Sequence, residues 1–218
     1  MKNKEEMSFL DHLEILRWHL IRSGIAILLF SILAFIFKEI IFDVVLLAPK
    51  DPNFLTYRFL CNISQALGLG DALCIKESPF SLMNINMAGQ FSAHLLTSFY
   101  AGFILAFPYV FWEIWRFVLP ALKEKEAKVS RGIVFFSSLL FLTGVIFGYF
   151  VIAPLSINFL GSYQVSQTVA NQISLTSFIS TVTTISLANG IIFELPILVY
   201  FLTKIGLLTP EFMRTYRR

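Results

Sequence analysis

Residues 132–152 read GIVFFSSLLFLTGVIFGYFVI, and they open a stretch in which no charged side chain occurs before Glu194. About 20 apolar residues are enough to cross the hydrocarbon core of a bilayer as a helix. Because the bilayer core offers no water to backbone groups, such a segment can satisfy its peptide hydrogen bonds only as a helix. The charge-free stretch is too long for one span. Its polar middle, LGSYQVSQTVANQ at residues 160–172, predicts a loop between two spans.

The composition excludes a soluble fold. Of the 218 residues, 56% are hydrophobic, 14% are charged and 24 are phenylalanine, and the mean hydropathy is +0.74. Soluble domains contain about 25% charged residues, and a chain this apolar could not cover its surface with so few charges. The net charge is only +3, and no basic block with interleaved aromatic residues occurs. A nucleic-acid partner is therefore not predicted.

The gaps between charges predict one all-α membrane domain, residues 1–218, with four spans. The predicted order is a cytoplasmic surface helix (1–19), a first span (20–42), an external loop with an approach helix (43–90), a second span (91–112), a cytoplasmic loop (113–131), a third span (132–152), an external loop (153–175), a fourth span (176–203) and a cytoplasmic tail (204–218). Pro108 and Pro196 fall inside spans, so those helices are expected to be kinked or tilted.

The positions of lysine and arginine predict the orientation of the spans. The external side carries four such residues, namely Lys38 at the end of the first span and Lys50, Arg58 and Lys76 in the first external loop, and the second external loop carries none. The opposite side carries many more, namely Lys2, Lys4, Arg17, Arg22, Arg116, Lys123, Lys125, Lys128, Arg131, Lys204, Arg214, Arg217 and Arg218. Because cytoplasmic loops are enriched in these residues, both ends of this chain are predicted to be cytoplasmic.

Cys61 and Cys74 both fall in the predicted external loop. That compartment permits a disulfide, and two unrelated thiols are the alternative. The three histidines, His12, His19 and His94, lie on or beyond the other side of that loop. Neither a metal site nor a cofactor is predicted.

Glu194 is an acidic residue deep in the fourth predicted span. A carboxylate in the membrane is costly, so it usually faces a polar partner or a wet cavity. The alternative is a protonated side chain bonded to a backbone carbonyl that Pro196 leaves free. On charge alone, Glu124 and Glu126 would belong to a solvated loop and Glu14 to a solvated helix face.

No catalytic motif emerges from the residues, so an enzyme is not predicted. Two classes of function remain. One is a non-enzymatic receptor for other membrane-inserting chains. The other is an ion-coupled small-molecule transporter that uses Glu194.

Several motifs, in order along the chain, resemble one known family. SFLDHLEILR (8–17) resembles F-x-x-H-L-x-E-L-R, WEIWRFVLPAL (112–122) resembles aromatic-Q-x-W-x-F-x-x-P-A-L, FGYFVIAPL (147–155) resembles the end of a third span, FELP (193–196) resembles F-E-x-P, and Ala48-Pro49 matches a proline after the first span. These are motifs of the TatC family, the multispanning signal receptor of the twin-arginine protein translocase.

The resemblance implies a concave, glove-like bundle of tilted and kinked helices in a bacterial inner membrane. The family has six spans, so four of them would be present, and the chain is expected to be truncated after Arg218. Family members bind arginine-pair signal peptides of folded cargo proteins, work with single-span TatA- and TatB-type partners, and draw on the proton gradient. Self-association is compatible with the resemblance.

The resemblance also implies roles for individual residues. Glu126 is expected to hold the arginine pair, together with Phe117, Glu124 and Arg17. The family's N-terminal glutamate falls on Ile15, so the neighbouring Glu14 is expected to replace it. The remaining expected positions are Glu194 and Pro196 for partner contact, and the structural prolines Pro49, Pro120 and Pro154.

Overall fold

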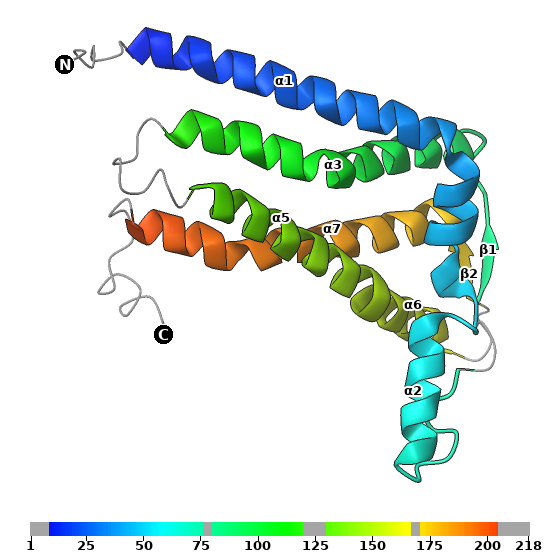
Figure 1. The fold of residues 1–218 in the computed structure, drawn as a ribbon. Helices are drawn as coiled ribbons and strands as arrows, with labels where there is room; N and C mark the ends of the chain where they lie inside the picture. The colour runs from blue at the N-terminus through cyan, green and yellow to red at the C-terminus, as the bar shows by residue number, and fades with distance from the viewer. Residues whose placement is uncertain (1–8, 76–79, 120–129, 167–170, 205–218) are drawn as a thin grey trace. The chain divides into compact units, whose positions relative to one another are not determined.

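The long helices of the chain are those that the apolar runs predict. A computed structural model describes residues 9–75, 80–119, 130–166 and 171–204. Within these residues, four helices are long and apolar enough to cross a membrane by length and composition. They span Leu13–Ile36, Gly89–Val118, Gly132–Ser162 and Leu175–Thr203 (Figure 1).

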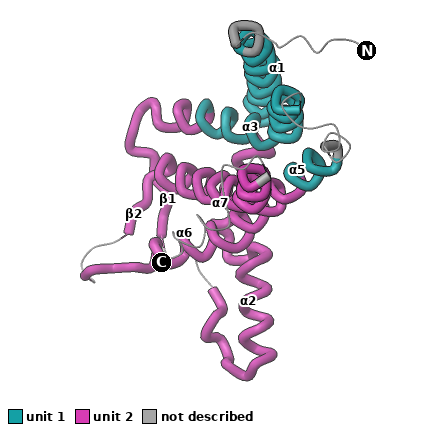
Figure 2. Tube along the Cα trace, turned by 90° about the vertical axis from the view of Figure 1, so that its left-hand side faces the viewer, with its two compact units in different colours: residues 1–38, 95–138 teal, residues 39–94, 139–218 magenta. Residues whose placement is uncertain are grey.

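Shorter elements connect the long helices. The order is α1 (Phe9–Ile36), a π-helical segment (Ile40–Leu46), a 3-10 turn (Ala48–Lys50), α2 (Leu55–Ala66), β1 (Ser81–Met83), α3 (Gly89–Val118), α5 (Ser130–Phe147), a second π-helical segment (Gly148–Ile152), α6 (Ala153–Ser162), β2 (Gln172–Ser174) and α7 (Leu175–Lys204). The chain divides into two compact units, which Figure 2 colours separately. Unit 1 contains residues 1–38 and 95–138, and unit 2 contains residues 39–94 and 139–218.

In unit 1, α1 and α3 approach closely where the side chains are small. A Cβ atom added to Gly102 would lie 2.5 Å from the backbone nitrogen of Ser31 and 2.7 Å from its Cα atom. Small residues let helix backbones come together in a membrane, where packing drives association. Ala34 and Ala106 are also buried in this unit. The two helices are therefore in direct contact around Ser31.

In unit 2, the core gathers residues from segments that are far apart in the sequence. It consists of Leu46, Phe80, Ala93, Ile157, Phe178, Ile179 and Val182. Beside it, β1 and β2 form a parallel pair in which Ser81 is opposite Gln172 and Met83 is opposite Ser174. This pairing ties the segment before α3 to the segment before α7.

Two glycines allow close packing between the third and fourth long helices within unit 2. A Cβ atom on Gly144 would lie 2.7 Å from the carbonyl oxygen of Asn189, and one on Gly148 would lie 2.9 Å from the Cα atom of Ser186. The two glycines are about one turn apart and so share a helix face. This is the small-xxx-small arrangement of membrane helices.

Tyr57 joins three segments of unit 2. Its hydroxyl group lies 2.9 Å from the carbonyl oxygen of Pro49 and 3.0 Å from that of Pro154, and can donate to either. Burial raises the pKa of Tyr57 from 10.0 to about 12, so the hydroxyl keeps its proton over the physiological range. On the same helix, Cys61 forms a disulfide with Cys74.

The helix ends differ from the predicted spans in several places. Helix α1 runs without a break from the predicted surface helix into the first span, as expected, whereas α3 continues to Val118, past residue 112 where the second span is predicted to end. Helix α6 occupies part of the predicted external loop 153–175. Its Pro154 closely follows the second π-helical segment, and the helix continues on both sides of this proline. The strands β1 and β2 were not predicted.

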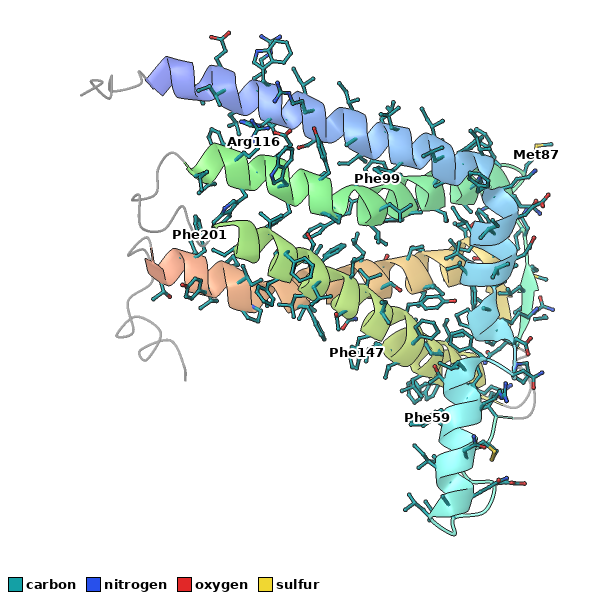
Figure 3. All side chains as sticks on the ribbon, in the orientation of Figure 1. Phe59, Met87, Phe99, Arg116, Phe147 and Phe201 are labelled. Carbon is teal, nitrogen blue, oxygen red and sulfur yellow. A yellow bond between two sulfur atoms is a disulfide. The ribbon has the colours of Figure 1, made fainter. Side chains whose placement is uncertain are left out.

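The long helices keep many apolar side chains on their surfaces. Figure 3 shows them as sticks, including Phe99 and Phe147, which are 53% and 40% exposed. Leu28 on α1 is 60% exposed and Phe135 on α5 is 65% exposed. Exposed apolar side chains of this kind suit contact with lipid tails, which are equally apolar.

The glycine contact predicts that Gly148→Ala lowers the stability of the protein. The nearest atoms of α7 are backbone or Cβ atoms, which cannot rotate away, so the helices must separate at a cost of about 1–3 kcal/mol. The thermal unfolding midpoint in detergent measures this loss. Gly132→Ala is the matched control, since nothing lies within 4 Å of its Cβ position. A loss as large in Gly132→Ala would contradict the packing explanation.

Removing the hydroxyl group with Tyr57→Phe is expected to destabilise the fold by about 1–3 kcal/mol, because the one donor shared by two buried carbonyl groups is lost. The raised pKa means that the wild-type contribution is complete below pH 10 and is lost as the pH rises through about 12. The difference in unfolding midpoint between the two proteins should therefore shrink over that range. Tyr163→Phe, at a 63% exposed position, is the control and should change nothing.

Candidate functional site

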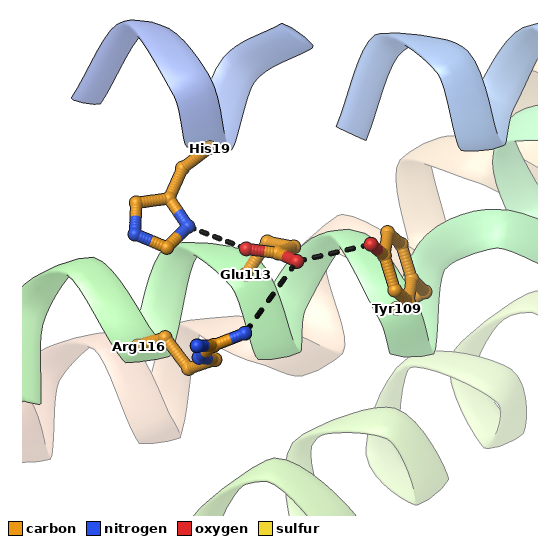
Figure 4. Close-up of polar contacts among 4 residues, drawn as sticks. All are labelled: His19, Tyr109, Glu113 and Arg116. Atoms are coloured by element: carbon orange, nitrogen blue, oxygen red, sulfur yellow. Dashed lines mark hydrogen bonds and ion pairs between the residues drawn. The ribbon is translucent and has the colours of Figure 1, made fainter. Parts of the chain in front are cut away.

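A buried carboxylate connects α1 to α3 in unit 1. Glu113 of α3 accepts a hydrogen bond from Nδ1 of His19 on its Oε2 atom. The hydroxyl group of Tyr109 donates to Oε1 at 3.0 Å, and Nη1 of Arg116 lies 3.9 Å from the same oxygen. Figure 4 shows these four side chains, which we call the Glu113 cluster. One carboxylate thus holds three polar partners.

The Glu113 cluster is well shielded from solvent. The side chain of Glu113 is 1% exposed and that of His19 is 13% exposed, whereas Arg116 is 47% exposed. Burying a carboxylate in an apolar environment is costly unless hydrogen bonds and opposite charge compensate for the lost water. His19, Tyr109 and Arg116 supply both. The arrangement stabilises the contact between α1 and α3. The four side chains of the cluster do not place a nucleophile beside a general base, so the cluster does not resemble a catalytic site.

Aromatic rings surround the Glu113 cluster. The ring of Phe117 meets that of His19 edge-on, with centroids 6.2 Å apart. The guanidinium carbon of Arg116 lies 4.8 Å from the ring centroid of Trp112, which is a cation–π contact. His19 therefore touches α3 at both Glu113 and Phe117, about one turn apart on the same face.

A cavity of about 530 Å³ lies between α3 and α5 within unit 1. Its lining residues are Pro108, Trp112, Trp115, Arg116, Leu119, Val134, Phe135 and Ser138. Most of the lining is apolar, and Arg116 is its cationic group. Glu113 does not line this cavity, so α3 presents its carboxylate to α1 and its tryptophans to the cavity.

The structure brings some of the predicted signal-binding residues into one unit. Glu14 and Arg17 are exposed on α1, the helix that also carries His19, and Phe117 is half-buried on α3. Ile15, where the family motif has glutamate, is also exposed on α1. Glu124 and Glu126 lie outside the described residues, as does Pro120.

The predicted residues of unit 2 have different surroundings. Glu194 is half-buried in α7, and Pro196 is exposed within the same helix. Pro49 and Pro154 are buried, and their carbonyl oxygens accept from Tyr57. These two prolines thus have a structural contact.

The sequence interpretation missed His19, Tyr109 and Glu113 as a group. Glu113 was assigned to the start of a loop, although α3 continues past it. One signal was available, because Glu113 occupies the place of the glutamine in the motif quoted above. An acid flanked by Trp112 and Trp115 is also unlike a solvated loop.

The fold and the Glu113 cluster define an all-α, multispanning membrane protein whose buried polar groups join helices. The family described as "Sec-independent protein translocase protein (TatC)" matches residues 11–218. Two curated relatives carry that name. The chain is 39% identical to the protein of Blattabacterium sp. subsp. Periplaneta americana, over 100% of this chain and 83% of the relative. It is 33% identical to that of Aquifex aeolicus, over 97% of this chain and 79% of the relative.

The solved structures agree with the sequence match. A crystal structure of the twin-arginine translocase receptor TatC superposes with a TM-score of 0.73 and 32% identity, and the match covers 94% of this chain and 80% of that one. The chain belongs to the TatC family. The predicted family and the all-α membrane fold are thereby confirmed, and the chain is a non-enzymatic component of protein transport.

Proposed function

We propose that this TatC-family chain receives the arginine-pair signals of folded proteins at the end of unit 1 formed by α1 and the last turn of α3. Glu126 binds the arginine pair with the support of Glu124, and Glu14 and Arg17 contribute from α1. Carboxylates suit this task because the guanidinium fork can donate two parallel hydrogen bonds to one carboxylate.

The contact of His19 with both Glu113 and Phe117 is the observation that supports this proposal most. It joins the helix that presents Glu14 and Arg17 to the helix end that presents Phe117. Glu126 follows shortly after Val118, the last residue of α3. Two exposed side chains and an aromatic ring of the proposed site therefore belong to one unit.

The excess of lysine and arginine supports a cytoplasmic location for this end of unit 1. The signal would then be read before the cargo crosses a bacterial inner membrane. The family match supports single-span TatA- and TatB-type proteins as partners. In this proposal, the proton gradient drives the transport of the cargo. For unit 2, we assign Glu194 and Pro196 to partner contact, because an intramembrane carboxylate is an energetically strong point of attachment.

An ion-coupled small-molecule transporter was the alternative. It rested on Glu194 alone, and the matched family transports proteins. No other feature of the described residues favours a transporter, and the receptor is the better supported function.

The receptor proposal predicts that Glu126→Gln weakens binding of an arginine-pair signal peptide. Glutamine keeps the shape but loses the charge, and a hydrogen bond to a charged group contributes about 1.5–3 kcal/mol. Affinity should fall roughly tenfold to a hundredfold in a fluorescence-anisotropy titration. Asp43→Asn removes an exposed acid from unit 2 and should bind like the wild type. Unchanged binding by Glu126→Gln would remove Glu126 from the site.

The displaced acid on α1 leads to a second binding prediction. Glu14→Ala should weaken binding of the arginine-pair signal, and Ile15→Glu in the same chain should restore it, because a carboxylate returns within about 100° of the helix face. Both positions are exposed, so the changes should not disturb the fold. If Glu14 is a solvated bystander, Glu14→Ala will bind normally and Ile15→Glu alone will bind more tightly.

A further inference from the structure

The Glu113 cluster holds α1 and α3 together at one end only. The bond between His19 and Glu113 joins residues 94 positions apart in the chain. The close contact of Gly102 with Ser31 joins the same two helices elsewhere. At 1.5 Å per residue, Ser31 is about 18 Å from His19 along α1. Loss of the His19 contact would therefore free one end of α1 while the other end stays packed.

His19 defines both the rotation and the position of α1 against α3. Its ring bonds to Glu113 and meets the ring of Phe117, so it contacts two successive turns of α3. Glu113 is itself held by Tyr109, from the turn before it. A shift or rotation of α1 would break at least one of these contacts. The carboxylate is 1% exposed, so a peptide does not reach it while the cluster is formed.

The proposed signal-binding residues of α1 lie close to His19. Arg17 and Glu14 precede it by about 3 Å and about 7.5 Å along the helix axis. Any rotation of α1 about the His19 contact would move both side chains relative to Phe117. A guanidinium fork requires its carboxylate partners at defined distances and angles.

We propose that His19 and Glu113 are positioning residues that hold Glu14 and Arg17 in register with Phe117, and so give the site its preference for an arginine pair. They touch each other and not the signal peptide. This inference rests on the proposed function, but it concerns the contact between α1 and α3 and not the carboxylates that bind the peptide.

The test measures affinity and discrimination together. Fluorescent Arg-Arg and Lys-Lys signal peptides are titrated against the full chain in nanodiscs. His19→Phe retains an aromatic ring beside Phe117 but cannot donate to Glu113. Its affinity for the Arg-Arg peptide should fall about tenfold, and its preference over Lys-Lys should shrink, because α1 no longer holds its binding residues at the geometry that a guanidinium fork requires.

Further variants separate positioning from general stability. Glu113→Gln keeps an oxygen acceptor for Tyr109, and its amide NH2 group can donate to Nδ1 of His19 in the other ring tautomer, so its affinity should stay within about threefold of the wild type. Glu113→Leu should lose as much affinity for the Arg-Arg peptide as His19→Phe does. The double variant should lose no more affinity than either single variant, because both changes break the same contact. Thr97→Val is the matched control, since this buried hydroxyl of α3 finds no hydrogen-bond partner among the described residues.

A distance measurement reports on the helices directly. Both cysteines of the chain are bridged, so spin labels can be attached specifically to Leu20→Cys and Ile114→Cys, at positions that are 58% and 48% exposed. The distance distribution between the labels should be narrow in the wild type and in Thr97→Val, and broad in His19→Phe. A loss of overall stability alone would leave the distribution of the folded protein narrow.

Each outcome decides the inference. Suppose that the wild type prefers the Arg-Arg peptide, and that His19→Phe keeps both this preference and a narrow distance distribution between the labels. That result would overturn the inference and leave the proposed function intact. A wild type that binds both peptides equally would refute the proposed function, and the inference with it. If Glu113→Leu does not fold, the result for His19→Phe alone tests the inference. This variant leaves Glu113 with two of its polar partners, Tyr109 and Arg116.

Discussion

The interior of a bilayer offers no hydrogen-bond partners, and the rest of this structure follows from that constraint. Backbone groups must be satisfied within helices, so the described spans are long helices. Helices gain little from burying apolar side chains against each other when lipid is equally apolar. They associate through close backbone contacts at Gly102, Gly144 and Gly148 instead. A buried carboxylate such as Glu113 persists only because His19, Tyr109 and Arg116 replace the missing water.

Each unit is joined by polar contacts between segments that are distant in the sequence. In unit 1, the Glu113 cluster joins α1 to α3. In unit 2, the hydroxyl group of Tyr57 reaches two buried proline carbonyls, and the strands β1 and β2 pair in parallel. Such contacts are strong where water is scarce and depend on geometry. The same physics that stabilises the units can therefore hold a recognition site in register.

Much of the fold could be predicted from the sequence because charge is excluded from spans. The gap between Arg131 and Glu194, with its polar middle, correctly predicts two long helices. The helix ends were harder to predict, because apolar residues continue past the predicted ends of the spans and Pro154 does not end its helix. Strands of three residues are too short to show alternation.

The candidate site was only partly predictable. Motifs pointed to Phe117, to Glu126 and to Ile15, next to which Glu14 lies, but motifs are local and contain no information on which side chains meet. The bond between His19 and Glu113 depends on how two helices pack, and the sequence shows only a histidine on one helix and an acid on another.

The central claim is that the chain distinguishes an arginine pair at its cytoplasmic face. Site-specific photocrosslinking tests it most directly, with a photoreactive amino acid in place of Lys125, next to Glu126. A signal peptide with Arg-Arg should give a covalent adduct, and the same peptide with Lys-Lys should give little or none. Equal adducts from both peptides, or no adduct together with small-solute flux in proteoliposomes, would contradict the claim.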